Sequence, residues 1–207
     1  IATPKQAPGR AASRVPPKLI LGSDSAYGRI ETEAGVKAIG RADVAAFHRR
    51  WFHPNNATLV VAGDTTLAES PPRTEATSAA WKSAPVPGTL APTSKPTAPS
   101  IVYLIDKPGT AQSVVQAALV VPPLQEGDEI ARQAFNTAFG GSFTSRLNMK
   151  LREEKGWTYG ARSAFGKTRG SRMLSIGAPV QSDKTAESMK EIATLLIQLT
   201  TDHRIGG

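Results

Sequence analysis

One helical stretch of apolar positions stands out from the rest of the chain. Phe143, Leu147 and Leu151 recur every fourth residue, which is the spacing of one apolar helix face. The pattern predicts a helix over residues 143–155 that begins after a Gly-Gly pair. We expect this helix to end at Gly156, because glycine readily adopts the left-handed conformation that closes a helix.

The positions after this glycine alternate as in a β-strand, over residues 157–165. Trp157, Tyr159 and Phe165 are expected to share one face of that strand. Arg152 lies near the end of the predicted helix and Tyr159 near the start of the predicted strand. The short turn between them is therefore expected to bring a guanidinium group and a phenolic hydroxyl to the same corner.

Arg152 and Tyr159 both donate hydrogen bonds at neutral pH, and neither readily binds a metal or abstracts a proton there. Such donors suit peptide carbonyl oxygens or the oxyanion that develops during acyl transfer. On composition alone, a second and purely structural interpretation is favoured. Arg152 would then be a solvated cation paired with Glu153 or Glu154, and Tyr159 a half-buried strand residue. The spacing alone does not decide between the two interpretations.

The C-terminal half of the chain has the pattern of an α+β domain, a two-layer antiparallel sheet with helices on one face. The expected strands span residues 101–105, 113–121, 157–165 and 172–178, and the expected helices span residues 128–139, 143–155 and 184–200. Asp128 and Asp183 are predicted to cap the first and last of these helices.

The N-terminal half reads as a helix followed by a strand. An amphipathic helix is predicted over residues 41–52, and residues 57–62 read as a buried strand. Pro71 and Pro72 exclude a continuous helix after that strand, because proline removes a backbone donor and clashes with the preceding turn. The proline-rich residues 84–100 are expected to form an extended linker.

The 207-residue chain has a formal net charge of +8, which raises nucleic-acid binding as an alternative function. Its best location is a stretch with Arg162, Lys167, Arg169 and Arg172. No aromatic beyond Phe165 is interleaved with these charges, and Lys and Arg are scattered through the chain, so an ordinary solvated basic surface is favoured. No transmembrane segment is expected, since no apolar run approaches the ~20 residues that span a bilayer. The absence of Cys leaves the redox compartment open.

Two long blocks resemble the pitrilysin/insulinase family of inverted-motif zinc peptidases. GGSFTSRLNMKLREEKGWTYGARS is similar to the motif of the second, non-zinc repeat. SAYGRIETEAGVKAIGRADVAAFHRRWFHPNNATLVVAGD is similar to the end of the first repeat. The resemblance implies the metallopeptidase-repeat fold with ferredoxin-like halves. It assigns residues 1–80 to the end of the zinc-side repeat, residues 81–100 to a linker and residues 101–207 to the front of the substrate-holding repeat.

The resemblance also implies roles for the corner described above. Arg152 and Tyr159 would hold peptide carbonyl groups and stabilise the oxyanion, and Gly140, Gly141 and Ser142 would contact the substrate. The full protein would hydrolyse peptide bonds in a peptide or unfolded polypeptide. A rival from another class is a non-catalytic assembly or processing-complex subunit on the same fold.

Zinc in this family is bound by an H-x-x-E-H helix in the first repeat, where two histidines one turn apart face one metal. His48, His53 and His203 do not have that spacing, and no acidic residue lies between the first two. We therefore expect no metal site in this chain, which would be inactive alone. Zinc is implied in a complementary half, either in the same longer chain or in a partner subunit. The first residue is Ile, so the chain is expected to be processed or part of a longer protein.

Overall fold

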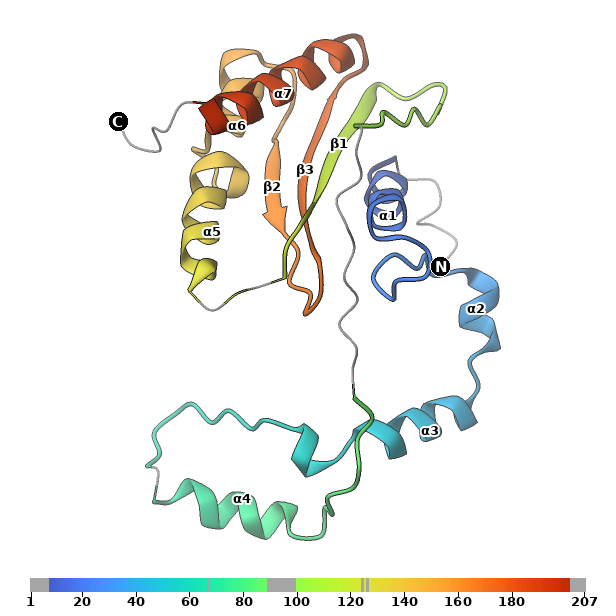
Figure 1. Cartoon of the computed structure of the whole chain (residues 1–207), viewed down its shortest axis with the longest axis vertical. Helices are drawn as coiled ribbons and strands as arrows, with labels where there is room; N and C mark the ends of the chain where they lie inside the picture. The colour runs from blue at the N-terminus through green and yellow to red at the C-terminus, as the bar shows by residue number, and fades with distance from the viewer. Residues whose placement is uncertain (1–7, 67, 89–99, 124, 126, 202–207) are drawn as a thin grey trace. The chain divides into compact units, whose positions relative to one another are not determined.

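The computed structural model describes residues 8–66, 68–88, 100–123, 125 and 127–201 (Figure 1). The chain divides into two compact units, of which unit 1 contains Ile1–Ile30 and Ala91–Gly207, and unit 2 contains Glu31–Leu90. Most of the predicted linker at residues 84–100 falls outside the described residues. The assignment of residues 1–80, 81–100 and 101–207 to family repeats stays a prediction.

Unit 1 is built on a three-stranded antiparallel sheet with the strand order β1–β3–β2 (Figure 1). The strands are β1 (Gln112–Val121), β2 (Arg162–Phe165) and β3 (Arg172–Gln181). β3 is central because Gly177 lies opposite Gln116 of β1 on one side and opposite Arg162 of β2 on the other. Antiparallel strands with helices confirm the predicted α+β class.

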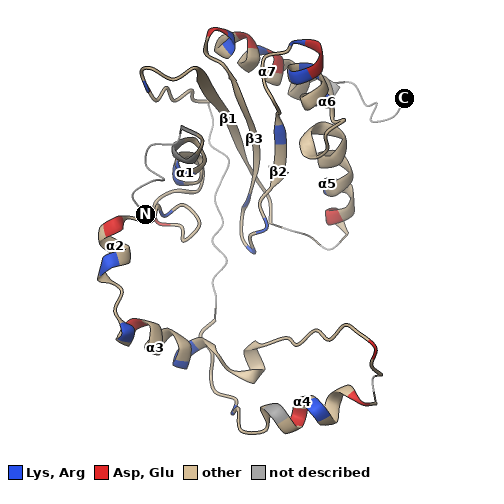
Figure 2. Cartoon of the chain, turned by 180° about the vertical axis from the view of Figure 1, so that it is seen from behind, with Lys and Arg blue, Asp and Glu red and all other residues tan. Residues whose placement is uncertain are grey.

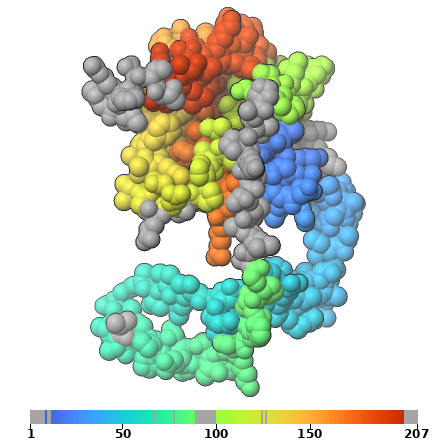
Figure 3. Space-filling view, viewed as in Figure 1, coloured from blue at the N-terminus to red at the C-terminus, as the bar shows by residue number. Residues whose placement is uncertain are grey.

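Helices and helical turns surround this sheet, with α7 in red and α5 in yellow packed around the orange strand segments (Figure 3). They are α1 (Pro8–Leu21), α5 (Asp128–Asn136), the π-helical turn η3 (Thr137–Gly141), α6 (Arg146–Asn148), the π-helical turn η4 (Met149–Glu154), the 3₁₀ turn η5 (Ser182–Lys184) and α7 (Thr185–Thr201). α1 lies against β1. No helix in the described part of the chain has both the length and the apolarity needed to cross a membrane.

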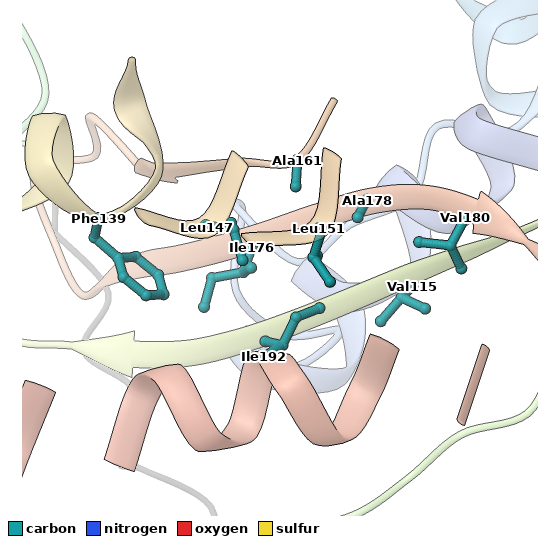
Figure 4. Close-up of a cluster of buried hydrophobic side chains, with 9 residues drawn as sticks. All are labelled: Val115, Phe139, Leu147, Leu151, Ala161, Ile176, Ala178, Val180 and Ile192. Atoms are coloured by element: carbon teal, nitrogen blue, oxygen red, sulfur yellow. The ribbon is translucent and has the colours of Figure 1, made fainter. Parts of the chain in front are cut away.

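The core of unit 1 forms where every second residue of β3 meets the helices. Leu174, Ile176, Ala178 and Val180 alternate with less buried neighbours, as one face of a strand should. Figure 4 shows the main cluster, which consists of Val115, Phe139, Leu147, Leu151, Ala161, Ile176, Ala178, Val180 and Ile192. Each Leu side chain fully removed from water contributes roughly 1.5–3 kcal/mol.

Two predicted features of unit 1 are wrong. Residues 101–105 form no strand and are exposed, because no ladder joins them to the sheet. The helix predicted from Phe143 starts at Arg146, since Ser145 is still extended with ψ 151°. Phe143 therefore lies outside the helix and is 55% exposed.

The predicted helix caps also need correction. The residue that precedes α5 is Gly127, at φ +93°, and it makes no side-chain capping bond. Asp128 is instead the first helical residue, and its carboxylate lies 3.4 Å from the Arg132 guanidinium one turn on. Asp183 lies in the 3₁₀ turn before α7 and is not its capping residue. Gly156, at φ +65°, closes the helical segment as expected.

Unit 2 contains α2 (Glu33–Ala38), α3 (Arg41–Trp51), a 3₁₀ turn (Pro54–Asn56) and α4 (Ser70–Ser78). None of its described residues is buried. Hydrogen bonds between distant segments close the unit instead. The Trp81 indole donates to the Phe52 carbonyl oxygen (3.2 Å), and the Asn55 amide donates to the Ala84 carbonyl oxygen (3.0 Å).

Two expectations for unit 2 are revised. The buried strand predicted at residues 57–62 is wrong, since these residues form no strand and Val60 is 82% exposed. A strand needs a neighbour for its backbone groups, and the described residues of unit 2 supply none. Pro71 and Pro72 do prevent a helix from running on from residue 64, but they lie in the first turn of α4, where a missing donor is tolerated.

Candidate functional site

The corner predicted from the sequence lies in unit 1, where η3, α6 and η4 lead into β2. Gly140 and Gly141 have packing roles at its start. A Cβ atom on Gly140 would lie 2.4 Å from Ser163 Oγ of β2, and one on Gly141 would lie 2.5 Å from Asn136 Nδ2. Both contacts are too short, so only glycine lets η3 approach its neighbours this closely.

Ser142 ends the π-helical turn η3. Its hydroxyl donates to the Thr137 carbonyl oxygen (3.0 Å), which satisfies a carbonyl group that the helix end leaves without a partner. The structure thus gives Gly140, Gly141 and Ser142 local structural roles. Their predicted contact with substrate stays a prediction.

Asn148 joins the helical segment to the strand. Its side-chain amide donates to the Phe143 carbonyl oxygen (2.7 Å) and accepts from the Ala161 N–H (3.0 Å), and the residue is 3% exposed. Asn136 holds the next part of the strand, since its side-chain oxygen accepts from the Ser163 hydroxyl (2.8 Å). Two side-chain amides, of buried Asn148 and half-buried Asn136, therefore fix the position of the chain on both sides of Arg162.

A β-bulge lies between the turn and β2. Thr158 pairs with Val180, and Arg162 pairs with Gly177. Three residues separate Thr158 from Arg162, whereas two separate Gly177 from Val180, so one extra residue is accommodated on the β2 side. The regular alternation predicted over residues 157–165 is therefore wrong, and the strand itself begins at Arg162.

The Thr158 side chain holds the bulge in place. Its hydroxyl oxygen donates to the Pro179 carbonyl oxygen and accepts from the Gly160 N–H (3.1 Å). Tyr159, inside the bulge, is 88% exposed, and its hydroxyl group bonds to none of the described residues. The bulge therefore turns the tyrosine away from the core.

Arg152 lies in η4 beside an aromatic ring. Its guanidinium carbon is 4.3 Å from the centre of the Phe143 ring, a cation–π distance. Its Nη1 atom is 3.4 Å from Glu153 Oε1, which realises one of the ion pairs of the second interpretation. This Nη1 atom is buried and has no partner in hydrogen-bond geometry among the described residues, because the ion pair is close but poorly aligned.

No hydrogen bond joins Arg152 to Tyr159 within the part of the chain that the structure describes. The two residues flank the turn at Gly156, one on each side. Glu154, the other predicted partner of Arg152, is bound to Lys150 at 2.6 Å instead. That hydrogen bond lowers the pKa of Glu154 and raises the pKa of Lys150.

Across the sheet, a buried cation anchors the hairpin between β2 and β3. Arg172 is 3% exposed, and it donates to the Gly166 carbonyl oxygen and to Glu129 Oε2 of α5 (3.0 Å). The hydrogen bond from Arg172, followed by one from Gln133, lowers the pKa of Glu129. Arg172 therefore binds within the fold and does not belong to an open basic surface.

The histidines of unit 2 have no metal-site geometry. His48 stacks on Phe52 with ring centres 4.7 Å apart. Among the described residues, no three His, Cys, Asp or Glu side chains gather as potential metal ligands. The described part of this chain therefore does not fit a zinc ion.

Sequence reasoning missed Asn148, Thr158 and the Glu129–Arg172 pair. Asn148 carried a usable signal, because a short polar side chain within a predicted helix often bonds to neighbouring backbone groups. The bulge left no such signal, since it depends on the register between two strands that are distant in sequence.

Comparison with known proteins gives the following similarities. A family model described as the peptidase M16 inactive domain matches residues 38–203. A peptidase M16 inactive domain from Pseudomonas fluorescens has a TM-score of 0.87 and 22% sequence identity, and the match covers 98% of this chain and 49% of that one. A protease from Helicobacter pylori has a TM-score of 0.74 and 21% sequence identity, and the match covers 84% of this chain and 44% of that one.

A conserved protein from Enterococcus faecalis V583 has a TM-score of 0.64 and 21% sequence identity, and the match covers 95% of this chain and 46% of that one. No curated protein matches the chain significantly. The matched regions amount to less than half the length of each of these three structures.

Proposed function

Because the chain belongs to the peptidase M16 inactive-domain family, we propose that it supplies the substrate-holding side of a zinc peptidase. In this proposal Arg152 and Tyr159 donate hydrogen bonds to a peptide carbonyl group and to the oxyanion that forms on it. The zinc ion belongs to a complementary half, in the same longer chain or in a partner subunit. The substrate is a peptide or an unfolded polypeptide.

The observation that carries the proposal is the bulge at Tyr159. A strand aromatic normally packs on the sheet, yet here Thr158 and the bulge hold Tyr159 in solvent with its hydroxyl unused by the described residues. Bulges often re-aim a side chain beside an active site. A fixed backbone with a free hydroxyl donor suits a group that must meet a substrate atom.

Arg152 adds a second donor near the same turn. The Arg152 side chain is 33% exposed, so N–H groups of the guanidinium other than the buried Nη1 remain available to donate to a substrate carbonyl oxygen. The Phe143 ring beside the guanidinium restricts its motion, so less conformational entropy is lost when the acceptor arrives.

The test uses the full-length protein, in which this chain is joined to or mixed with its complementary half. Arg152→Ala and Tyr159→Phe are each expected to lower kcat/KM by roughly tenfold to a thousandfold, because each removes a donor to the substrate carbonyl group or the oxyanion. Metal content and melting temperature should stay unchanged. The double variant should lose less than the product of the two losses, because both groups serve one substrate.

Matched controls are available within the chain. Tyr103→Phe changes another exposed tyrosine, and Arg169→Ala changes an exposed arginine in the β2–β3 turn. Both variants should keep full kcat/KM. If Tyr159→Phe leaves kcat/KM unchanged and Arg152→Ala lowers only the melting temperature, the corner is structural. A full-length protein without zinc or peptidase activity would favour the rival class, a non-catalytic assembly subunit.

A further inference from the structure

A hollow of ≈ 370 Å³ lies on the face of the sheet opposite the core cluster of unit 1. Its floor includes Ser175 and Gly177, which alternate along β3 with the core residues Ile176 and Ala178. α1 reaches its rim at Gly9. The hollow is therefore bounded by three strands and one helix.

One row of residues across the three strands defines the middle of the hollow. Gln116 of β1, Gly177 of β3 and Arg162 of β2 are direct register partners. Two long hydrogen-bonding side chains thus flank a glycine on the central strand. The neighbouring row, Ala118, Ser175 and Ala164, has only small side chains, which leaves room above the sheet.

The Gln116 amide lies over Gly177 and extends toward the β2 side. A Cβ atom at position 177 would lie 2.9 Å from Gln116 Nε2 and 3.5 Å from its Cδ atom. Only glycine at this position lets the amide occupy that place. Strands are ~4.8 Å apart, so side chains from the two outer strands can reach a shared ligand above the central one.

Charge in the hollow has a single sign. The sequences of β1, β2 and β3 contain no Asp or Glu, and no red appears on the strands (Figure 2). The sequence of α1 likewise has cations and no acidic residue. Within the described part of the chain, neither the Arg162 guanidinium nor the Gln116 amide has a hydrogen-bond or ion-pair partner.

We propose that this hollow binds a carboxylate group of a peptide, with the Arg162 guanidinium and the Gln116 amide as donors. A guanidinium fork matches the two oxygens of a carboxylate, and an amide N–H adds a neutral donor to the same anion. The proposal rests on the proposed function for its choice of a peptide. Gly160, next to Tyr159 in the bulge, also lines the hollow, so a peptide held at Tyr159 has a neighbouring residue within reach.

The carboxylate has two possible sources, an acidic side chain or the C-terminus of the peptide. The test therefore measures fluorescence anisotropy of the full-length protein with three labelled peptides of otherwise equal sequence. The first has one internal Glu and an amidated C-terminus, the second replaces that Glu by Gln, and the third combines the Gln with a free C-terminal carboxylate. We expect at least one carboxylate peptide to bind about tenfold more tightly than the neutral peptide, the size of a charge-assisted hydrogen bond.

Arg162→Gln is expected to abolish this preference, with little change in the affinity of the neutral peptide. Gly177→Ala should reduce it as well, because the new Cβ atom displaces the Gln116 amide. Arg169→Gln is the matched control and should keep the preference. A preference that survives Arg162→Gln, or equal binding of all three peptides, would overturn the proposal.

Failure of the carboxylate site and failure of the proposed function give different results. Arg152→Ala and Tyr159→Phe test turnover, and we expect them to lower kcat/KM for acidic and neutral peptides alike. Arg162→Gln should change only the ratio of the affinities for the carboxylate peptides and the neutral peptide. A protein that shows the Arg162-dependent binding preference without peptidase activity would refute the proposed function and support the carboxylate site.

Discussion

Both units have helices with apolar residues at regular spacing, but among the described residues only those of unit 1 pack into a buried core. In unit 1, Leu147 and Leu151 are fully buried against Ile176 of the sheet. In unit 2, Val44 and Phe47 recur on α3 with comparable spacing and remain exposed. The comparison shows that an apolar periodicity identifies which face of a helix is suited to burial. Whether that face is buried depends on a second surface that packs against it.

The units also differ in what holds them together. Unit 1 combines apolar burial with buried side-chain hydrogen bonds, as at Asn148. Unit 2 relies on exposed hydrogen bonds such as that from the Trp81 indole to Phe52. Water competes for exposed hydrogen bonds, so the net contribution of each is small. The following predictions test this contrast, from the largest expected effect to the smallest.

The largest effect is expected from a cavity in the core of unit 1. Leu147→Ala should lower the free energy of unfolding of unit 1 by about 2–5 kcal/mol, because the side chain is fully buried. Leu59→Ala in unit 2 removes an exposed side chain of the same type and should change stability by less than about 0.5 kcal/mol. Urea unfolding followed by circular dichroism measures both. Equal losses would show that unit 2 has a hidden core.

Asn148→Ala should have the next largest effect. It leaves the Ala161 N–H and the Phe143 carbonyl oxygen without their partner, at a cost of about 1–3 kcal/mol. Amide hydrogen exchange should accelerate at Ala161 more than at Ile176, in the centre of the sheet. Asn56→Ala in unit 2, which removes an exposed bond to the Trp51 carbonyl oxygen, is the control and should cost less. Unchanged exchange at Ala161 would contradict the role assigned to Asn148.

The Glu129–Arg172 pair should make unit 1 sensitive to acid. The folded state lowers the pKa of Glu129 below its ordinary value of 4.5, chiefly through the hydrogen bond from Arg172. Ionised Glu129 therefore contributes its full stabilisation of the folded state above pH 4.5. This stabilisation is lost as the pH falls through the lowered pKa of Glu129. Glu129→Gln should weaken the dependence of the melting temperature on pH in the acid range. If the melting temperatures of the variant and the original protein depend on pH in the same way, Glu129 does not contribute to the acid sensitivity.

The smallest effect is expected from Trp81→Phe in unit 2. The change removes the indole N–H that donates to the Phe52 carbonyl oxygen and keeps an aromatic ring in place. An exposed hydrogen bond of this kind contributes about 0.5–1.5 kcal/mol. Hydrogen exchange should increase at Ala84, whose N–H bonds to the Asn55 side chain in the same closure, and not at Ala161 of unit 1. A global loss of stability in both units would refute the local character of this bond.

The sequence predicted local features well wherever chain neighbours determine them. The glycine stop at Gly156, the helix at α3 and the strands β1 and β3 all follow from local pattern and residue chemistry. Residues 57–62 and 101–105 have equally strong strand patterns but no pairing partner among the described residues. A strand is a property of two segments, so its pattern in one segment cannot establish it.

The candidate site was predictable in part. The positions of Arg152 and Tyr159 on either side of the Gly156 turn follow from the predicted helix and strand, although their roles stay predictions. Alternation placed Tyr159 on the same face as Trp157 and Phe165, which are half-buried, whereas Tyr159 is exposed. The extra residue of the bulge causes this error, because it depends on the pairing of residues 158 and 162 with β3.

The bulge also has an evolutionary consequence. Since Thr158 and Arg162 keep their pairing while Tyr159 lies in solvent, the fold places no packing demand on the side chain at position 159. Selection on that side chain can therefore act through chemistry alone. A single codon change could remove the phenol from a descendant protein, or restore it, while the surrounding strand, core and register are inherited intact.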